Sequence, residues 1–113
     1  MPLEISHKET APGVVVVTLS GKMMMGTVAD RVVALTDDLL RAGKRTIVFD
    51  LSDVTALDST GVGQFISSFN KIIAAGGEMR MAGAGGHIFQ TFHVSLLDKV
   101  FTFYPSVEEA ARV

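Results

Sequence analysis

Two adjacent hydroxyl side chains, Ser59 and Thr60, form the part of this sequence best suited to chemistry. They follow the carboxylate of Asp58 and precede Gly61 and Gly63, at the point where an amphipathic helical pattern begins. The first turn of a helix has free backbone N–H groups and the positive end of the helix dipole, and both favour an anionic group such as phosphate. The sequence therefore predicts a site where a charge is added to a surface hydroxyl, rather than one where substrate bonds are broken.

Local interpretations of these residues compete with a functional one. Ser59 is a preferred residue type at a helix N-cap, where its side chain would contribute about 0.5–2 kcal/mol. Gly61 and Gly63 each cost a helix roughly 1 kcal/mol relative to alanine. The gain that offsets this cost is either the close approach of a partner's backbone or tight packing on the sheet. Asp58 could orient Ser59, contact a partner or shape the turn before the helix, and spacing alone leaves these alternatives open.

Composition limits the classes of function. The chain has 113 residues, of which 48% are hydrophobic and 19% charged, so we expect one folded domain over residues 1–113. The net charge is −2 without a basic stripe, which argues against nucleic acid or acidic lipid as partners. Cysteine is absent, which excludes disulfides, thiol catalysis and thiolate metal ligands. With neither a signal peptide nor an apolar run of roughly 18–20 residues, we expect a cytoplasmic protein without direct membrane contact.

Strand patterns dominate the first half of the chain. Polar and apolar residues alternate over residues 3–8, and residues 14–19 form a β-branched run typical of a strand covered on both faces. We expect these two strands to form a hairpin. A further apolar strand covers residues 46–49, and we expect Asp50 and Asp53 to shape the turn that follows it.

Apolar periodicity predicts two longer helices. Thr27 and Asp30 resemble a capping box that opens the first helix, which Gly43 ends. The second helix begins near Ser59 and ends at Gly76. Its apolar face consists of Val62, Phe65, Ile66, Phe69, Ile72 and Ile73. The opposite face is expected to be exposed and consists of Gln64, Ser67, Ser68 and Lys71.

Shorter elements alternate after the second helix. They are a strand at residues 79–81, a short helix marked by Ile88, Phe89 and Phe92, a strand at residues 100–104 and a terminal helix capped by Ser106 and Glu109. Strands and helices that alternate in this way form a parallel sheet with crossover helices. We therefore predict a single α/β domain, in which an initial β-hairpin leads into a mostly parallel mixed sheet. We expect about four or five strands and about four helices.

Three consecutive methionines, Met23, Met24 and Met25, form an unusual run. Methionine adapts to irregular surfaces and is frequent at binding faces. Consecutive residues of an extended segment cannot all point inward, so at least one of the three should face solvent or a partner. An apolar patch that joins Met24 to Val62 would mark an interface. Packing in the core is the expectation for the other methionines.

No metal ion, cofactor or enzymatic site is expected. His87 and His93 are six positions apart on a short helix, so they lie on different faces. Residues 83–86 lack the Lys-Ser/Thr pair of a phosphate-binding loop and the spacing of a dinucleotide fingerprint. Ser59 lies outside any Gly-x-Ser-x-Gly elbow, and no histidine has a sequence-based reason to approach it. We therefore expect a protein that is not an enzyme.

The chain resembles STAS domains, in particular bacterial anti-sigma factor antagonists. In that family an apolar strand is followed by Asp-Leu-Ser, a short spacer, and Asp-Ser-Ser-Gly-Leu-Gly at the start of a helix. Here residues 50–52 are Asp-Leu-Ser, and residues 58–63 are Asp-Ser-Thr-Gly-Val-Gly. The strand end Leu-Ser-Gly at residues 19–21 is similar to the family's Leu-x-Gly. The resemblance covers nearly the whole chain.

The resemblance implies a switch between protein partners. Ser59 would be phosphorylated by an anti-sigma factor that also has ATP-dependent serine kinase activity. The unphosphorylated form would bind this anti-sigma factor and free a sigma factor for transcription, and a phosphatase would reset the switch. Around Ser59, the residues expected to bind the partner are Asp58, Thr60, Gly61, Val62 and Met24.

Two residues depart from the family pattern. Thr60 replaces the usual second serine and offers a competing hydroxyl. Met24 stands where the family often has an acidic residue shortly after Leu-x-Gly. At this position we therefore expect no carboxylate that orients the serine or contacts the kinase.

The alternative is a scaffold-type STAS protein without a phosphoswitch. Such a protein would build a larger assembly or accompany a transporter or a lipid-trafficking system. The sequence leaves open whether the chain forms a dimer through its methionine segment.

Overall fold

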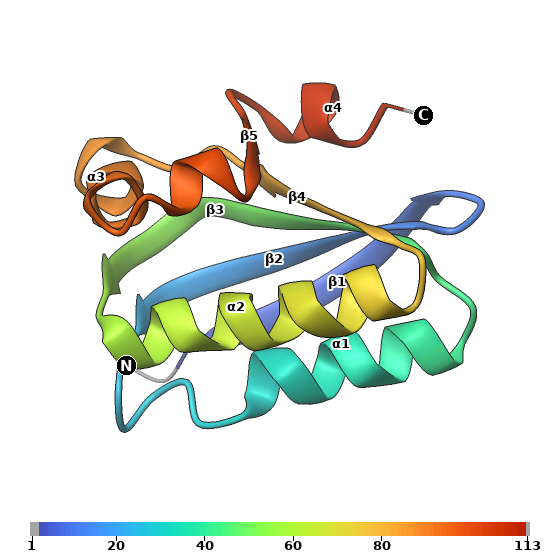
Figure 1. Ribbon diagram of the computed structural model, residues 1–113, viewed down its shortest axis with the longest axis horizontal. Coiled ribbons are helices and arrows are strands. Elements are labelled where there is room, and N and C mark those ends of the chain that lie inside the picture. The colour runs from blue at the N-terminus through green and yellow to red at the C-terminus, as the bar shows by residue number, and fades with distance from the viewer. Residues whose placement is uncertain (1–2, 113) are drawn as a thin grey trace.

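The computed structural model describes residues 3–112, which contain a five-stranded sheet in the order β1-β2-β3-β4-β5 (Figure 1). The strands are β1 (Glu4–Ala11), β2 (Val14–Met23), β3 (Thr46–Leu57), β4 (Glu78–Ala82) and β5 (Thr102–Tyr104). β1 pairs antiparallel with β2, and every later pair is parallel. The predicted α/β fold, with a hairpin that leads into a mostly parallel sheet, is therefore confirmed.

Within the same residues, four α-helices and one short 3-10 helix surround the sheet. They are α1 (Arg31–Arg41), α2 (Ser59–Ala74), α3 (Gly86–Val94), the 3-10 helix η1 (Leu97–Lys99) and α4 (Val107–Ala110). α1 and α2 lie side by side along one face of the sheet, whereas α4 lies on the opposite face (Figure 1). α3 packs near the carboxyl end of β3, close to the start of α2.

Three phenylalanines connect the sheet to two of the helices. Phe49 of β3, Phe65 of α2 and Phe92 of α3 have no exposed surface. The ring centre of Phe65 lies 5.3 Å from that of Phe49 and 5.8 Å from that of Phe92. Edge-to-face and tilted ring pairs at these distances add to the stabilisation that burial provides. Phe65 therefore holds the first half of α2 against both the sheet and α3.

The strand β3 is longer than the sequence predicts. The expected turn at Asp50 and Asp53 is wrong, because β3 continues to Leu57 and pairs there with Met23 of β2. Two register shifts interrupt this pairing, so the polar residues are accommodated without ending the strand. Within β3, Asp50 Oδ1 accepts hydrogen bonds from the backbone N–H and the hydroxyl of Ser52, at 3.0 and 2.6 Å. The long β3 carries the chain to the end of the sheet where α2 begins.

The turn before α1 also differs from its prediction. Thr27 and Asp30 do not form a capping box, because the N-cap of α1 is Asp30 and its side chain makes no cap hydrogen bond. Thr27 Oγ1 instead donates to the carbonyl oxygen of Lys22 at 2.7 Å and accepts from the backbone N–H of Met24 at 3.3 Å. Thr27 therefore shapes the turn that follows β2.

Two polar residues of α2 are buried, although the sequence pattern places them on an exposed face. Thr36 Oγ1 of α1 donates to Ser68 Oγ at 3.1 Å, and the backbone N–H of Val33 donates to Gln64 Oε1 at 3.3 Å. Conversely Ile66, from the expected apolar face, is 39% exposed. The reason is that α1 covers the polar side of α2, a contact between helices that periodicity within α2 cannot indicate.

The predicted helix ends agree with the structure, whereas the last strand is shorter than predicted. Gly43 and Gly76 lie just beyond α1 and α2 with φ angles of 86° and 78°, a conformation that favours glycine. Ser106 caps α4, because its Oγ accepts from the backbone N–H of Glu109 at 3.3 Å. The strand expected at residues 100–104 begins only at Thr102, since η1 precedes it.

Replacing Phe65 with alanine tests this view of the core. We expect Phe65→Ala to lower the free energy of unfolding by about 3–5 kcal/mol, because a fully buried ring leaves a cavity. The matched control is Ile73→Ala on the same helix, where the side chain is 50% exposed. It should change the free energy of unfolding by about 0.5 kcal/mol or less. Urea unfolding followed by circular dichroism measures both, and equal losses would contradict the central position of Phe65.

Candidate functional site

Asp58, rather than Ser59, caps α2. Asp58 has extended backbone angles, φ −114° and ψ −175°, and its Oδ1 accepts from the backbone N–H of Gly61 at 3.0 Å. The interpretation of Ser59 as the N-cap is therefore wrong by one residue. Ser59 is the first residue of α2, it is exposed, and its hydroxyl has no hydrogen-bond partner among residues 3–112. A hydroxyl that is free and accessible is available for modification.

The second carboxylate oxygen of Asp58 is also occupied. Oδ2 accepts from the backbone N–H of Met25 at 3.0 Å, across 33 positions of sequence. The hydrogen bonds from Met25 and then Gly61 hold the pKa of Asp58 below its ordinary value, because both stabilise the ionised form. Asp58 therefore keeps its negative charge beside Ser59.

The two glycines of the first turns of α2 have different explanations. A Cβ added to Gly61 would overlap the carbonyl oxygen of Met23, so Gly61 permits α2 to pack on the end of β2. A Cβ added to Gly63 would meet no atom within 4 Å. The tight-packing alternative thus explains Gly61 and does not explain Gly63. What Gly63 provides is open space beside Ser59.

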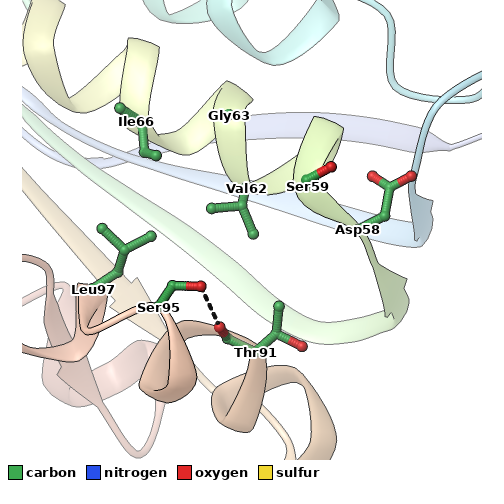
Figure 2. A pocket seen from close by; sticks show the side chains of 8 residues that line it. All are labelled: Asp58, Ser59, Val62, Gly63, Ile66, Thr91, Ser95 and Leu97. Atoms are coloured by element: carbon green, nitrogen blue, oxygen red, sulfur yellow. Dashed lines mark hydrogen bonds between the residues drawn. The ribbon is translucent and has the colours of Figure 1, made fainter.

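That open space is part of a groove of about 420 Å³ between α2 and the α3–η1 segment (Figure 2). Its lining consists of Asp58, Ser59, Val62, Gly63, Ile66, Thr91, Ser95 and Leu97. Thr91 and Ser95 donate their hydroxyls to carbonyl oxygens four residues earlier, at 3.1 and 3.0 Å. These two hydroxyl protons are therefore already used, and the remaining contacts that the groove offers are mainly apolar, from Val62, Ile66 and Leu97. Figure 2 shows Ser59 at the Asp58 end of this groove.

The three consecutive methionines differ in burial, as the sequence predicts, and Met25 is the most exposed of them. Met23 has no exposed surface, Met24 is half-buried and Met25 is 78% exposed. One methionine facing outward is therefore confirmed. The remaining predicted contact residues around Ser59 are Thr60, which is half-buried, and Val62, which is 8% exposed at the wall of the groove.

Sequence reasoning missed the other wall of the groove. On that wall, Leu97 lies in η1, for which the sequence pattern predicts no helix. On the α2 wall, the apolar spacing predicts a core position for Ile66, whereas the structure places it in the groove lining. Val94, Leu96 and Val100 lie near the Leu97 wall with 68%, 62% and 52% exposure. Within residues 94–100 the sequence pattern assigns only Val100 to an element, the strand expected at residues 100–104, and it gives no signal for η1.

The histidines have other partners. His87 Nε2 lies 3.0 Å from the carbonyl oxygen of Thr55, and His93 Nδ1 lies 2.8 Å from Asp98 Oδ2. No histidine is hydrogen-bonded to Ser59 within residues 3–112, and the same residues contain no cluster of three or more potential metal ligands. In this part of the chain, no helix has the length and hydropathy needed to cross a bilayer.

Matched substitutions at the two glycines test their assigned roles. Gly61→Ala should destabilise the fold or shift α2, because the added methyl group collides with the backbone of Met23. Gly63→Ala should instead raise the free energy of unfolding by about 0.5–1 kcal/mol, the difference in helix propensity. Thermal and urea unfolding of both variants provide the measurement. A loss of stability in Gly63→Ala would contradict the open space at that position.

The charge on Asp58 should make stability depend on pH. A carboxylate whose pKa is lowered by folding contributes stability that is complete above about pH 4 and is lost as the pH falls through the lowered value. The difference in unfolding free energy between the wild type and Asp58→Asn should therefore shrink on acidification. Asp53→Asn is the control, since Asp53 is exposed and makes no side-chain hydrogen bond within residues 3–112. A difference for Asp58→Asn that stays constant would count against the two hydrogen bonds.

Comparisons with known proteins identify the fold and the family of the chain. A protein from Thermotoga neapolitana, named as a homolog of the anti-sigma factor antagonist TM1081, is 24% identical over 74 residues, which is 66% of each chain. An anti-sigma factor antagonist from Mycobacterium paratuberculosis superposes with a TM-score of 0.82 at 25% identity, covering 96% of this chain and 90% of that one. The phosphorylated form of SpoIIAA from Bacillus has the same fold, with a TM-score of 0.73 at 20% identity, over 95% and 96% of the two chains.

A family model extends these pairwise similarities to nearly the whole folded chain. The model for the STAS domain matches residues 6–110, which include the whole sheet except the first two residues of β1 and contain the complete Asp-Ser-Thr-Gly segment at the start of α2. The resemblance stated from the sequence motifs is thereby confirmed. The protein belongs to the STAS domain family.

Proposed function

We propose that this protein is an anti-sigma factor antagonist that is switched by phosphorylation of Ser59. In the unphosphorylated form it binds an anti-sigma factor that is also a serine kinase, and transfer of a phosphate to Ser59 releases it. A phosphatase restores the binding form. The observation that carries this proposal is the Ser59 hydroxyl, which is exposed at the helix start, does not cap the helix and lies directly beside an open apolar groove.

Electrostatics explain how one phosphate can act on binding without unfolding the domain. Phosphorylation adds about −1.5 to −2 charges at neutral pH. The helix N-terminus tolerates an anion, so the fold should be little affected. Across an interface, the same charge lies beside the ionised Asp58 and is strongly hydrated. Burying it against a partner that fits the neutral hydroxyl can cost several kcal/mol, which is enough to release that partner.

The residues around Ser59 have different parts in this proposal. Val62, in the groove wall, and the half-buried Thr60 and Met24 supply contact surface for the partner. Gly61 acts indirectly, by allowing α2 to start close to β2. Thr60 is a less accessible acceptor than the exposed Ser59, which favours Ser59 as the modified residue.

The proposal describes a regulator rather than an enzyme. Ser59 lacks a histidine partner within residues 3–112, so a hydrolytic triad has no support there. The net charge of −2 gives nucleic acid no electrostatic attraction. The relatives named as anti-sigma factor antagonists support a partner in the transcription machinery, and we place the exchange in the cytoplasm.

Substituting Ser59 with a charged residue tests the switch. We expect Ser59→Asp to weaken binding to the anti-sigma factor at least tenfold, which corresponds to about 1.4 kcal/mol or more. The thermal midpoint should stay nearly unchanged. The control is Ser67→Asp, which places the same charge on an exposed residue of α2 outside the groove. Calorimetry with the kinase partner measures affinity, and mass spectrometry after incubation with that partner and ATP identifies the modified residue.

Two outcomes would contradict the proposal. One is wild-type affinity in Ser59→Asp, and the other is a phosphate on a residue other than Ser59. A protein that assembles with itself and retains full function as Ser59→Ala would instead support the scaffold alternative.

A further inference from the structure

The geometry points to Asp58 as a positioning residue that fastens segment 24–30, between β2 and α1, to the start of α2. By doing so it presents Met25 and Ser59 together to the same anti-sigma factor. This inference rests on the proposed function and adds a second contact to it. It also gives Asp58 a role that needs no direct contact with either the partner or the Ser59 hydroxyl.

Asp58 is hydrogen-bonded to three parts of the chain: segment 24–30, the end of β2 and the first turn of α2. Asp58 Oδ1 accepts from the backbone N–H of Gly61 and Asp58 Oδ2 from that of Met25, each at 3.0 Å. In addition, the backbone N–H of Asp58 donates to the carbonyl oxygen of Met23 at 3.3 Å. The carboxylate is therefore used on both oxygens, one within α2 and one across to segment 24–30.

Hydrogen bonds within the turn stabilise segment 24–30 near Met24, Thr27 and Val28, but none of them involves Met25. Thr27 Oγ1 donates to the carbonyl oxygen of Lys22. The backbone N–H groups of Thr27 and Val28 both donate to the carbonyl oxygen of Met24 at 3.0 Å, and the Val28 side chain is fully buried. Met25 lies at the tip, and within residues 3–112 its only hydrogen bond is the one to Asp58.

The backbone of this segment includes an unfavourable conformation. Ala29 has a φ of 44°, a region that residues with a Cβ rarely adopt. A segment with such a residue needs fixed contacts to keep its shape. The bond from Met25 to Asp58 is the contact that ties its tip to the helix bearing Ser59.

The exposed thioether of Met25 defines the chemistry of the contact. Its side chain is 78% exposed, although methionine gains most when it is buried against apolar groups. The anti-sigma factor should therefore present an apolar pocket to Met25, in addition to the contacts that it makes in the groove of Val62 and Ile66. Asp58, which is hydrogen-bonded to the backbone of Met25 and adjacent to Ser59, would keep these contacts in a fixed relation to the hydroxyl that is modified.

The test uses the near-isosteric variant Asp58→Asn. An asparagine keeps one oxygen to cap α2 by accepting from Gly61, but its amide nitrogen cannot accept from the N–H of Met25. Hydrogen exchange of the Met25 amide should become at least tenfold faster, and its acceleration should exceed that of the Phe65 amide, which reports only the loss of overall stability. Asp53→Asn removes the same charge from an exposed residue without these bonds and should change neither amide.

Binding to the anti-sigma factor supplies the second measurement. Asp58→Asn and Met25→Ala should each weaken the affinity about fivefold to tenfold, and the double variant should be no weaker than either single variant. Fully additive losses would overturn the inference, because Asp58 would then contact the partner itself. An unchanged exchange rate at Met25 would overturn it as well.

This test can fail independently of the proposed function. If phosphorylation of Ser59 does not release the partner, the switch is wrong, whereas hydrogen exchange at Met25 still reports on the role of Asp58. If the switch is right and Asp58→Asn keeps wild-type affinity, only the positioning role is wrong.

Discussion

The parallel pairing of Met23 with Leu57 is the constraint on which the functional end of this molecule depends. It extends β2 and β3 together, so that the chain leaves both strands at one end of the sheet. Because of it, the turn after β2 and the start of α2 lie within hydrogen-bond distance of each other. Gly61 makes this proximity sterically feasible, since any side chain there would collide with Met23.

Features that depend on nearby residues could be predicted from the sequence. The apolar periodicity that identifies α2, the glycines beyond α1 and α2, and the Ser106 cap all reflect interactions within a few positions of the chain. Features that depend on distant residues could not. The polar run around Asp53 is typical of a turn, and only its pairing with β2 makes it a strand. Burial of Ser68 likewise requires Thr36 on another helix.

The candidate site shows the same division. The position of Ser59 at a helix start followed from its neighbours, as did an outward-facing methionine. Which residue caps the helix was missed by one position, because serine and aspartate are nearly equal as N-caps and only the geometry of the turn selects between them. The groove could not be predicted, since its second wall consists of Thr91, Ser95 and Leu97, which follow Ser59 by more than 30 positions.

The empty space at Gly63 has a consequence for how such proteins diverge. An added Cβ at Gly63 meets no atom within 4 Å, so alanine fits there without a steric clash, yet a side chain at this position would narrow the groove next to Ser59. Discrimination between competing partners is obtained as readily by a steric block against one as by better contacts with another. Under the proposed function, the size of the residue at position 63 would therefore select which partner the groove accepts, while the scaffold stays the same.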